Sequence, residues 1–416
     1  MEELQLSDFC DITMGQSPQG TECNSSGQGV PLLNGPTEFG LISPIPVQWT
    51  INPRKFSKPE DLLFCVRGST TGKMNWSDQR YAIGRGLAAI SPRTPSTMHF
   101  FKGLIESNLP SLLAGATGST FPNVSRPDLA TIPVQVSDID YIQSASQVLE
   151  GIERKIELNQ RMNQTLEDIA KAIFESWFVD FDPVRAKVEG RSTGLPGEIG
   201  DLFPDAFEDS EIGRIPAGWK VSPLDSIGTF KNGLALQKYP PLEGLERLPV
   251  VKIAQLRKGS TIGDDTYASG VPDGFVIDDG DFVFSWSGTL MAKYWVGGRG
   301  ALNQHLFKVE GQTQPLWMVA GWVAHFMPEF QSIAASKATT MGHIQREHLR
   351  QALCIIPPTD VVDASSAIMT PIVERCILAQ QESKVLLELR DTLLPKLISG
   401  ELCIPDAEKF LQEAGI

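Results

Sequence analysis

The stretch 141-YIQSASQVLEGIERKIELNQRMNQTLEDIAKAIFESWFVDFDP-183 has the pattern of one long helix. It contains no proline before Pro183, and apolar or small residues recur at alternating spacings of three and four, as at a coiled-coil seam. The seam positions are Leu149, Ile152, Ile156, Asn159, Asn163, Leu166, Ala170, Ile173 and Trp177. A helix of about 38 residues would be about 57 Å long. We therefore predict a long helix over 140–182.

The same alternation returns late in the sequence and predicts a second long helix over 361–400. Its seam positions are Ile372, Cys376, Ala379, Ser383, Leu386, Arg390, Leu393 and Leu397. Each seam is thin and carries polar residues, so either helix alone would be marginal, and we expect the two to pair as an antiparallel coiled coil. Asn159 and Asn163 would fix the register of the pair. The alternative is that each helix packs only on its own globular part.

An internal repeat with an offset near 220 residues runs through the chain. Four collinear pairs of segments carry it: 118–140 with 338–360, 66–73 with 285–293, 7–18 with 223–235, and 149–160 with 370–381. In the second of these pairs Gly68 matches Gly288, and in the first Arg126 matches Arg346. We interpret the chain as a tandem duplication.

Each copy begins with a strand-rich part, over 1–139 and 216–360, in which short apolar runs alternate with glycine and proline turn signals. Residues 183–215 are rich in glycine, proline and acidic side chains and are expected to be a linker, and residues 401–416 a tail. The predicted fold class is α+β: two similar strand-rich domains joined by two long antiparallel coiled-coil helices, related by a pseudo-twofold axis.

The composition points to a globular protein with a net charge of −14, from 36 basic and 50 acidic residues. Such a charge argues against nucleic-acid binding on its face, although binding responds to the local field. The sequence has no apolar run long enough to span a bilayer, which predicts a cytoplasmic protein. Its six cysteines form no CxxC pair, so we expect reduced thiols and no zinc site.

Catalytic motifs are missing from the sequence. It has no GxxxxGK[ST] loop, no GxGxxG after a strand and no HExxH. The acidic pair Asp180 and Asp182 before Pro183 is similar to a methyltransferase motif, but no cofactor-binding glycine motif accompanies it, and a helix-terminating role is favoured. Glu382 and Lys384 match part of a nuclease motif within the predicted coiled coil and are interpreted as solvated helix surface. We predict no catalytic residue, metal or cofactor.

Binding chemistry remains, because small polar residues beside cations recur in both strand-rich parts. Lysine and arginine suit phosphates and guanine, asparagine and glutamine suit adenine, and hydroxyl groups suit backbone oxygens. The predicted DNA-contacting residues are Gln16, Ser17, Arg67, Ser69, Thr70, Lys73, Arg85, Ser119, Lys231, Asn232, Lys252, Ser285, Ser287, Thr289, Lys293, Arg299, Asn303, Gln304, Lys337 and Thr339. Taken singly, each is better explained as part of an ordinary turn, and only their recurrence at equivalent places of the two copies favours binding.

Several segments resemble the specificity subunit of type I restriction-modification systems. ESWFVDFDPVRAKVEG after the first helix and LRDTLLPKLISGEL at 389–402 resemble its two post-helix signatures. PNVSRPDLATIPVQV and GHIQREHLRQALCIIPP resemble the segments that close its recognition domains, and IPAGWKVSPLDSIGTFKNG resembles the opening of the second domain. The similarity spans nearly the whole chain in the family's order.

The resemblance implies a DNA-binding subunit without catalytic activity. In that family two target-recognition domains each read one half of a bipartite double-stranded DNA sequence, and the helices set the gap. The implied partners are two modification subunits, which methylate adenine, and restriction subunits with translocase and nuclease activity. Two other hypotheses are a coiled-coil scaffold with two protein-binding heads and a self-contained nuclease or methyltransferase.

The ends of the two predicted helices carry large apolar side chains, which would be costly to leave in water. We expect them to dock against a recognition domain or a modification subunit; the alternative is packing within the chain alone. The predicted partner-binding residues are Phe174, Trp177, Phe178, Phe181, Leu393, Leu394, Leu397 and Ile398.

Overall fold

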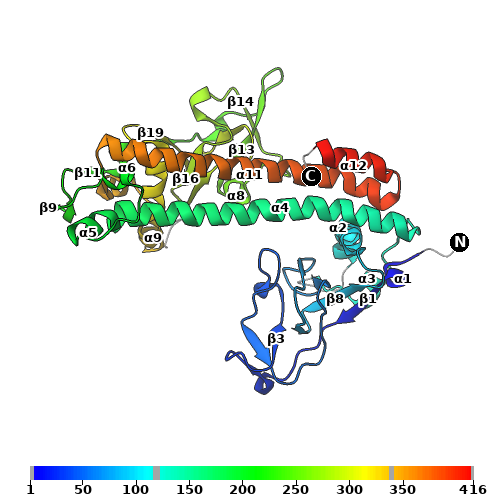
Figure 1. Ribbon diagram of the computed structural model, residues 1–416. Coiled ribbons are helices and arrows are strands. Elements are labelled where there is room, and N and C mark those ends of the chain that lie inside the picture. The colour runs from blue at the N-terminus through cyan, green and yellow to red at the C-terminus, as the bar shows by residue number, and fades with distance from the viewer. Residues whose placement is uncertain (1–3, 116–121, 337–341, 414–416) are drawn as a thin grey trace. The chain divides into compact units, whose positions relative to one another are not determined.

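The computed structural model describes residues 4–115, 122–336 and 342–413 (Figure 1). The chain forms two compact units, one of residues 1–158 with 383–416 and the other of residues 159–382. Each unit contains one strand-rich domain and a segment of each long helix. We call these domains domain 1 (residues 4–138) and domain 2 (residues 220–358).

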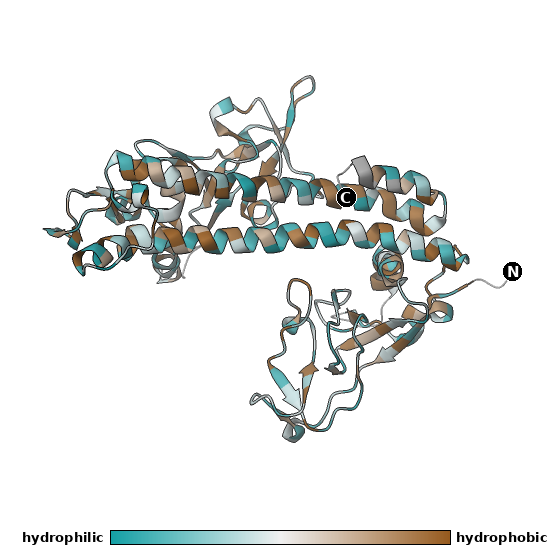
Figure 2. Ribbon diagram, in the orientation of Figure 1, coloured by the Kyte–Doolittle hydropathy of each residue, from teal (hydrophilic) through white to brown (hydrophobic). Residues whose placement is uncertain are grey.

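The two long helices are α4 (Ile139–Phe174), which continues as the π-helical turn Glu175–Val179, and α11 (Thr359–Ser399). In the first unit the hydroxyl of Tyr141 donates to the carbonyl oxygens of Leu397 (3.2 Å) and Leu402 (2.8 Å). In the second unit Asn159 Nδ2 donates to Glu382 Oε2 over 3.0 Å. Early residues of α4 thus meet late residues of α11, which confirms the antiparallel pair, and Figure 2 shows apolar residues recurring along both helices.

Domain 1 is built from two small sheets with the strand orders β1-β8-β5-β6 and β2-β4-β3-β7. Its strands are β1 (Cys10–Met14), β2 (Cys23–Asn24), β3 (Val30–Leu33), β4 (Gln48–Thr50), β5 (Leu62–Cys65), β6 (Met74–Trp76), β7 (Ala82–Ile83) and β8 (Leu87–Pro92). Its helices are α1 (Leu6–Phe9), α2 (Met98–Gly115) and α3 (Arg126–Ala130).

Domain 2 has sheets of order β12-β19-β16-β17 and β14-β13-β18-β15, and β11 pairs with β20. The strands are β11 (Lys220–Pro223), β12 (Gly228–Asn232), β13 (Arg247–Val251), β14 (Tyr267–Ser269), β15 (Val276–Ile277), β16 (Phe282–Ser285), β17 (Met291–Tyr294), β18 (Gly300–Leu302), β19 (Leu306–Gly311) and β20 (Leu353–Ile356). The helices are α7 (Leu224–Ile227), α8 (Ile253–Lys258), α9 (Leu316–Ser336) and α10 (Arg346–Gln351).

The topology of the two domains is similar but not identical, because the fourth strand of the smaller sheet, β2 or β15, lies on opposite edges. The larger sheet, β1-β8-β5-β6 in domain 1 and β12-β19-β16-β17 in domain 2, has the same antiparallel order in both. The smaller sheet, β2-β4-β3-β7 in domain 1 and β14-β13-β18-β15 in domain 2, contains one parallel pair in each, β3 with β7 and β13 with β18. The bridge between Gln5 and Pro133 in domain 1 corresponds to the pairing of Pro223 with Leu353 in domain 2. The predicted α+β class with two similar strand-rich domains is confirmed. The sequence pattern of these parts predicts strands with only a few short helices, and this is wrong for α2 and α9, which are long.

Residues 183–215 are ordered rather than an open linker. They form α5 (Asp182–Val188), α6 (Gly197–Gly200) and the hairpin of β9 (Phe207–Ser210) with β10 (Gly213–Pro216). Val184 and Phe203 are buried in the core of the second unit, because the segment carries apolar residues between its glycines and prolines. The expected tail, 401–416, includes α12 (Ile404–Glu413).

Helix α4 ends where the chain reverses direction beside its aromatic residues. The π-helical turn Glu175–Val179 is followed by Phe181 in the left-handed conformation (φ 58°). Ser176 Oγ donates to Asp182 Oδ2 over 2.8 Å, and Arg185 Nε donates to the carbonyl oxygen of Asp180 over 2.7 Å. The two aspartates therefore take part in the reversal.

The end of each long helix packs into a notch left by a glycine on a helix of a strand-rich domain. A Cβ atom built on Gly321 of α9 would lie 2.4 Å from the ring of Phe174. The equivalent atom on Gly103 of α2 would lie 2.3 Å from Leu394 Cδ1. Helix α4 follows domain 1 but ends on domain 2, and α11 follows domain 2 but ends on domain 1.

All eight predicted partner-binding side chains are buried in these two cores, with at most 7% of any of them exposed. The rings of Phe174 and Trp322 lie 5.2 Å apart, and those of Phe178 and Trp317 lie 5.8 Å apart. These side chains contact the chain's own strand-rich domains and leave little surface for another protein. Partner binding at these positions stays a prediction.

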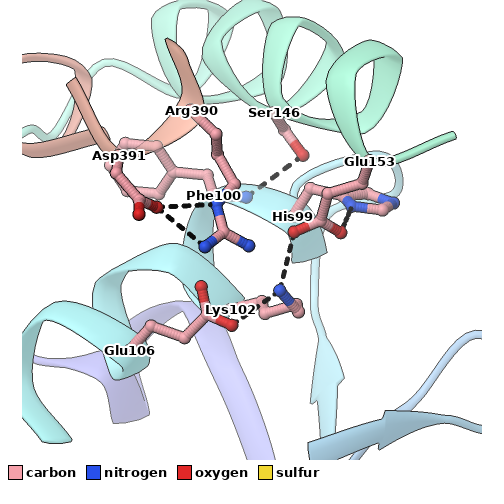
Figure 3. Close-up of polar contacts among 8 residues, drawn as sticks. All are labelled: His99, Phe100, Lys102, Glu106, Ser146, Glu153, Arg390 and Asp391. Atoms are coloured by element: carbon pink, nitrogen blue, oxygen red, sulfur yellow. Dashed lines mark hydrogen bonds and ion pairs between the residues drawn. The ribbon is translucent and has the colours of Figure 1, made fainter. Parts of the chain in front are cut away.

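Domain 1 has in addition a charged cluster against the long helices (Figure 3). Glu153 of α4 accepts from Lys102 Nζ (2.6 Å) and lies 3.0 Å from His99 Nδ1, both residues of α2. Lys102 also pairs with Glu106 over 2.7 Å. Burial acts to raise the pKa of Glu153, but the hydrogen bond with His99 and the charge of Lys102 outweigh it and hold the pKa at about 2.

Replacing Gly321 with alanine is expected to lower the free energy of unfolding by about 1 to 3 kcal/mol, because the new methyl group would overlap the buried ring of Phe174. Urea unfolding measures the change. Gly115→Ala is the control, since a Cβ there meets nothing within 4 Å. Adding Phe174→Leu should recover part of the loss, and equal stability of the two alanine variants would contradict the notch.

Replacing Glu153 with glutamine should destabilise the protein by about 3 kcal/mol at neutral pH, because it leaves Lys102 buried without one of its two carboxylates. Since the folded-state pKa lies below the ordinary value of 4.5, the contribution is full above that pH and is lost as the pH falls toward 2.

Unfolding measured from pH 7 to pH 2 should thus show the difference between wild type and Glu153→Gln shrinking in acid. The control is Glu150→Gln on the same helix, where the pair with the exposed Arg154 contributes less than about 1 kcal/mol. A constant difference across this pH range would refute the assignment.

Candidate nucleic-acid interface

The larger sheet of domain 1 gathers several predicted contact residues at one of its ends. β1 and β5 finish there and β6 and β8 begin there, because neighbouring strands are antiparallel. The loops at this end present side chains that are exposed: Gln16, Ser17, Arg67, Ser69, Lys73 and Arg85. Ser17 Oγ accepts a hydrogen bond from the backbone N–H of Arg85 (3.1 Å), which ties two of these loops together.

Domain 2 presents the equivalent loops at the same end of its larger sheet. Asn232 closes β12, and Thr289 lies between β16 and β17 and accepts from Arg257 Nη2 over 2.7 Å. Gly68 and Gly288 occupy matching turns with φ of 91° and 66°, a conformation that favours glycine. The bridges from Arg67 to Asn123 and from Ser287 to His343 are likewise equivalent.

In both domains the backbones of two of these loops lie in close contact. A Cβ atom on Gly15 would lie 2.2 Å from the carbonyl oxygen of Gly84, and one on Gly233 would lie 2.3 Å from that of Asn303. A side chain at either glycine would push the loops apart.

Some predicted contact residues are instead used inside the chain. Ser285, Ser287 and Asn303 are buried: Ser285 Oγ donates to the carbonyl oxygen of Ser287 (3.1 Å), and Asn303 Oδ1 accepts from the N–H of His305 (3.2 Å). Thr70 Oγ1 lies 3.6 Å from the thiol of Cys65. These polar groups hold the loops in shape.

Three cations of domain 2 also have partners within the chain. The Lys231 ammonium lies 4.4 Å from the ring centroid of Phe275, and Arg299 pairs with Glu246 and Asp278, each over 3.4 Å. Burial lowers the pKa of Lys293, and the nearby carboxylate of Glu167 opposes this shift. Ser119, Lys337 and Thr339 lie outside the described residues.

Two surface hollows adjoin the loops and bring in residues that the sequence analysis missed. The hollow of domain 1, about 490 Å³, is lined by Pro18, Gly20, Cys23, Asn24, Ser25, Leu32, Asn34 and Gln48. The hollow of domain 2, about 290 Å³, is lined by Gln237, Lys252, Ile253, Ala254, Asn303, Gln304 and His305. Asn34 and Gln48 were not predicted as contacts, and their positions in the repeat were the signal that could have found them.

The acidic residues are distributed unevenly along the chain. Residues 79–105 of domain 1 contain four cations, Arg80, Arg85, Arg93 and Lys102, and no aspartate or glutamate, and residues 282–309 of domain 2 likewise contain no acidic residue. The segment of domain 2 includes Asn303, Gln304 and His305, which line its hollow, and the segment of domain 1 includes the exposed Arg85 of the loops. Because binding responds to the local field, the net charge does not exclude a polyanionic ligand.

The described residues contain no group of three or more His, Cys, Asp or Glu side chains arranged to hold a metal ion. Within the same part of the chain no helix is both long and apolar enough to cross a bilayer. All six cysteines are free thiols, and burial raises the pKa of the Cys10 and Cys354 thiols well above the usual range.

Comparisons with known proteins agree with the observed architecture. Residues 1–168 match the family model described as the type I restriction modification DNA specificity domain. The chain is 22% identical over 403 residues to the type I restriction enzyme HindI specificity subunit of Haemophilus influenzae, covering 84% of this chain and 88% of that protein. It is 23% identical over 298 residues to the MjaIX specificity subunit of Methanocaldococcus jannaschii, covering 70% and 65%.

Among solved structures, the fold is similar to that of the type I restriction-modification S subunit from M. genitalium. The TM-score is 0.57 with 15% identity, and the match covers 95% of each chain. Two strand-rich domains with paired long helices, the matched family model and relatives aligned over most of the chain lead to one conclusion. The chain belongs to the DNA specificity subunits of type I restriction-modification systems.

Proposed function

We propose that domains 1 and 2 each read one half of a bipartite double-stranded DNA target, and that the α4–α11 pair sets the length of the unread gap. One observation supports this most: the same loops, on the same end of the same sheet, occur twice in one chain. A non-catalytic role agrees with the missing motifs of the sequence. Methylation and cleavage then belong to partner subunits.

The proposed assembly contains two modification subunits that methylate adenine, and restriction subunits with translocase and nuclease activity. Because the eight helix-end side chains are buried, other surface of the chain must carry part of the contact with the modification subunits. Exposed apolar side chains of the long helices, Leu158 of α4 and Leu378 and Val385 of α11, are available for it. The isolated chain should bind DNA weakly, since modification subunits around the duplex would supply many phosphate contacts.

The proposed functional boundaries follow the two copies of the repeat. They are 1–139 and 216–360 for the recognition domains, 140–182 and 361–400 for the helices, 183–215 for the connection and 401–416 for the final segment.

Exchanging residues 1–139 for the matching part of another specificity subunit should change only one half of the methylated motif, because each domain reads its half separately. The measurement is methylome sequencing of cells that carry the exchanged subunit with its modification subunits. Cells without the specificity gene are the control and should leave the motif unmethylated. A change in both halves would end the two-domain proposal.

Replacing Arg67 and Lys73 with glutamine should weaken DNA binding about equally for all sequences, since both are exposed and suited to phosphates. Each lost contact should reduce the slope of log K against log salt by about one. Titration of the complex with its modification subunits at several salt concentrations measures the slope. Arg154→Gln removes an exposed charge from α4 and is the control; an unchanged slope in the double variant would exclude these contacts.

A further inference from the structure

Backbone hydrogen bonds identify two pairs of equivalent positions in the domains. Leu33 of β3 pairs in parallel with Ile83, and Val251 of β13 pairs in parallel with Leu302. The next residues repeat the pattern: the N–H of Gly84 donates to Leu33 (2.7 Å), and that of Asn303 donates to Val251 (3.1 Å). Position 34 therefore corresponds to position 252, and position 85 to position 304.

The turns after these strands are alike as well. The N–H of Leu87 donates to the carbonyl oxygen of Gly84, and that of Leu306 to the carbonyl oxygen of Asn303, both over 3.0 Å. Arg85 and Gln304 thus occupy the same place in the same turn, in agreement with the repeat offset near 220.

The chemistry at these two positions is exchanged between the domains. Domain 1 has an amide, Asn34, at the first position and a cation, Arg85, at the second. Domain 2 has a cation, Lys252, at the first and an amide, Gln304, at the second. Each domain therefore holds one amide and one cation, in opposite order.

The two positions of each domain lie close together on accessible surface. A Cβ atom on Gly84 would lie 2.6 Å from Asn34 Oδ1, and one on Gly86 would lie 2.2 Å from the carbonyl oxygen of Asn34, so Asn34 contacts the backbone on both sides of Arg85. Lys252 and Gln304 line the same hollow. Asn34 and Arg85 are exposed, and Lys252 and Gln304 are partly exposed.

In both domains a residue at a third position accepts a hydrogen bond from the side chain at the first position and so orients it. Asn34 Nδ2 donates to Gln48 Oε1 (3.0 Å), and Lys252 Nζ donates to Thr266 Oγ1 (3.0 Å). Gln48 and Thr266 are equivalent, because each lies on the neighbouring antiparallel strand beside Leu32 or Val250. Asn34 keeps one N–H and its oxygen for a ligand, and Lys252 keeps two of its three protons.

We propose that Asn34, Arg85, Lys252 and Gln304 read bases in the major groove and determine the sequence specificity of the two domains. The free N–H and oxygen of Asn34 match N7 and N6 of adenine, and Gln304 offers the same pair. Arg85 and the two free protons of Lys252 match O6 and N7 of guanine. Each domain reads one adenine and one guanine, with the two positions exchanged. This inference rests on the proposed function.

The test exchanges the chemistry of domain 1 for that of domain 2 in the double variant Asn34→Lys with Arg85→Gln. The specificity subunit is expressed with its modification subunits, and the methylome is sequenced. We expect methylation of the original motif to be lost, and any new motif to differ at one or two positions of a single half. Arg93→Gln, which removes a cation from the opposite end of β8 where it pairs with Asp11 (3.0 Å), should leave the motif unchanged.

The double variant Asn34→Ala with Arg85→Ala keeps the inference testable if the exchanged variant is inactive. Binding of the purified complex to the original target and to duplexes altered at single positions gives the ratio of specific to non-specific affinity. This ratio should fall by about 10- to 100-fold, while non-specific binding changes little.

An unchanged motif in the exchange variant, or an equal loss of the affinity ratio in Arg93→Gln, would overturn the inference. The exchange of residues 1–139 separates this failure from failure of the proposed function. If that exchange alters one half while the Asn34 and Arg85 variants alter nothing, domain 1 reads DNA through other residues.

Discussion

The structure depends most on the burial of the two long-helix ends against domains that precede the other helix in the chain. Phe174 of α4 fills the notch at Gly321 in domain 2, and Leu394 of α11 fills the notch at Gly103 in domain 1. An aromatic or leucine side chain contributes about 1.5 to 3 kcal/mol when it is fully buried. Because each helix ends on the domain of the other copy, neither copy of the repeat has a complete core by itself.

The two docking sites use different interactions. In domain 2 the helix end meets a set of aromatic rings that includes Trp317 and Trp322. In domain 1 the contact adds the charged cluster in which Glu153 of α4 pairs with Lys102 of α2. A buried charged cluster accepts fewer alternative arrangements than an apolar surface does, since an unpaired charge there is costly. Duplicated domains with different docking chemistry are less prone to exchange places.

The net charge of the chain and the charge of the loops proposed to face DNA are separate quantities. Acidic residues dominate the sum, but segment 282–309 and segment 79–105 contain none. A ligand at the loops experiences the local field, which falls off within about 10 Å at moderate salt. An acidic protein can therefore present two surfaces that suit a polyanion.

The sequence alone determined the long helices, their antiparallel pairing, the duplication and the absence of catalytic motifs, because periodicity and motif spacing are properties of neighbouring residues and a repeat appears when the sequence is aligned with itself. It underestimated α2 and α9, since Pro110 and Pro328 inside them are signals that usually end a helix. It selected Arg85, Lys252 and Gln304 but not Asn34 and Gln48, which the structure places at the same loops and hollows, and it selected Ser285 and Asn303, which the fold buries. Only the tertiary structure decided which loops meet, because parallel pairing of β3 with β7 and of β13 with β18 joins residues about 50 positions apart. No local pattern records a contact of that range, and side-chain burial follows from it.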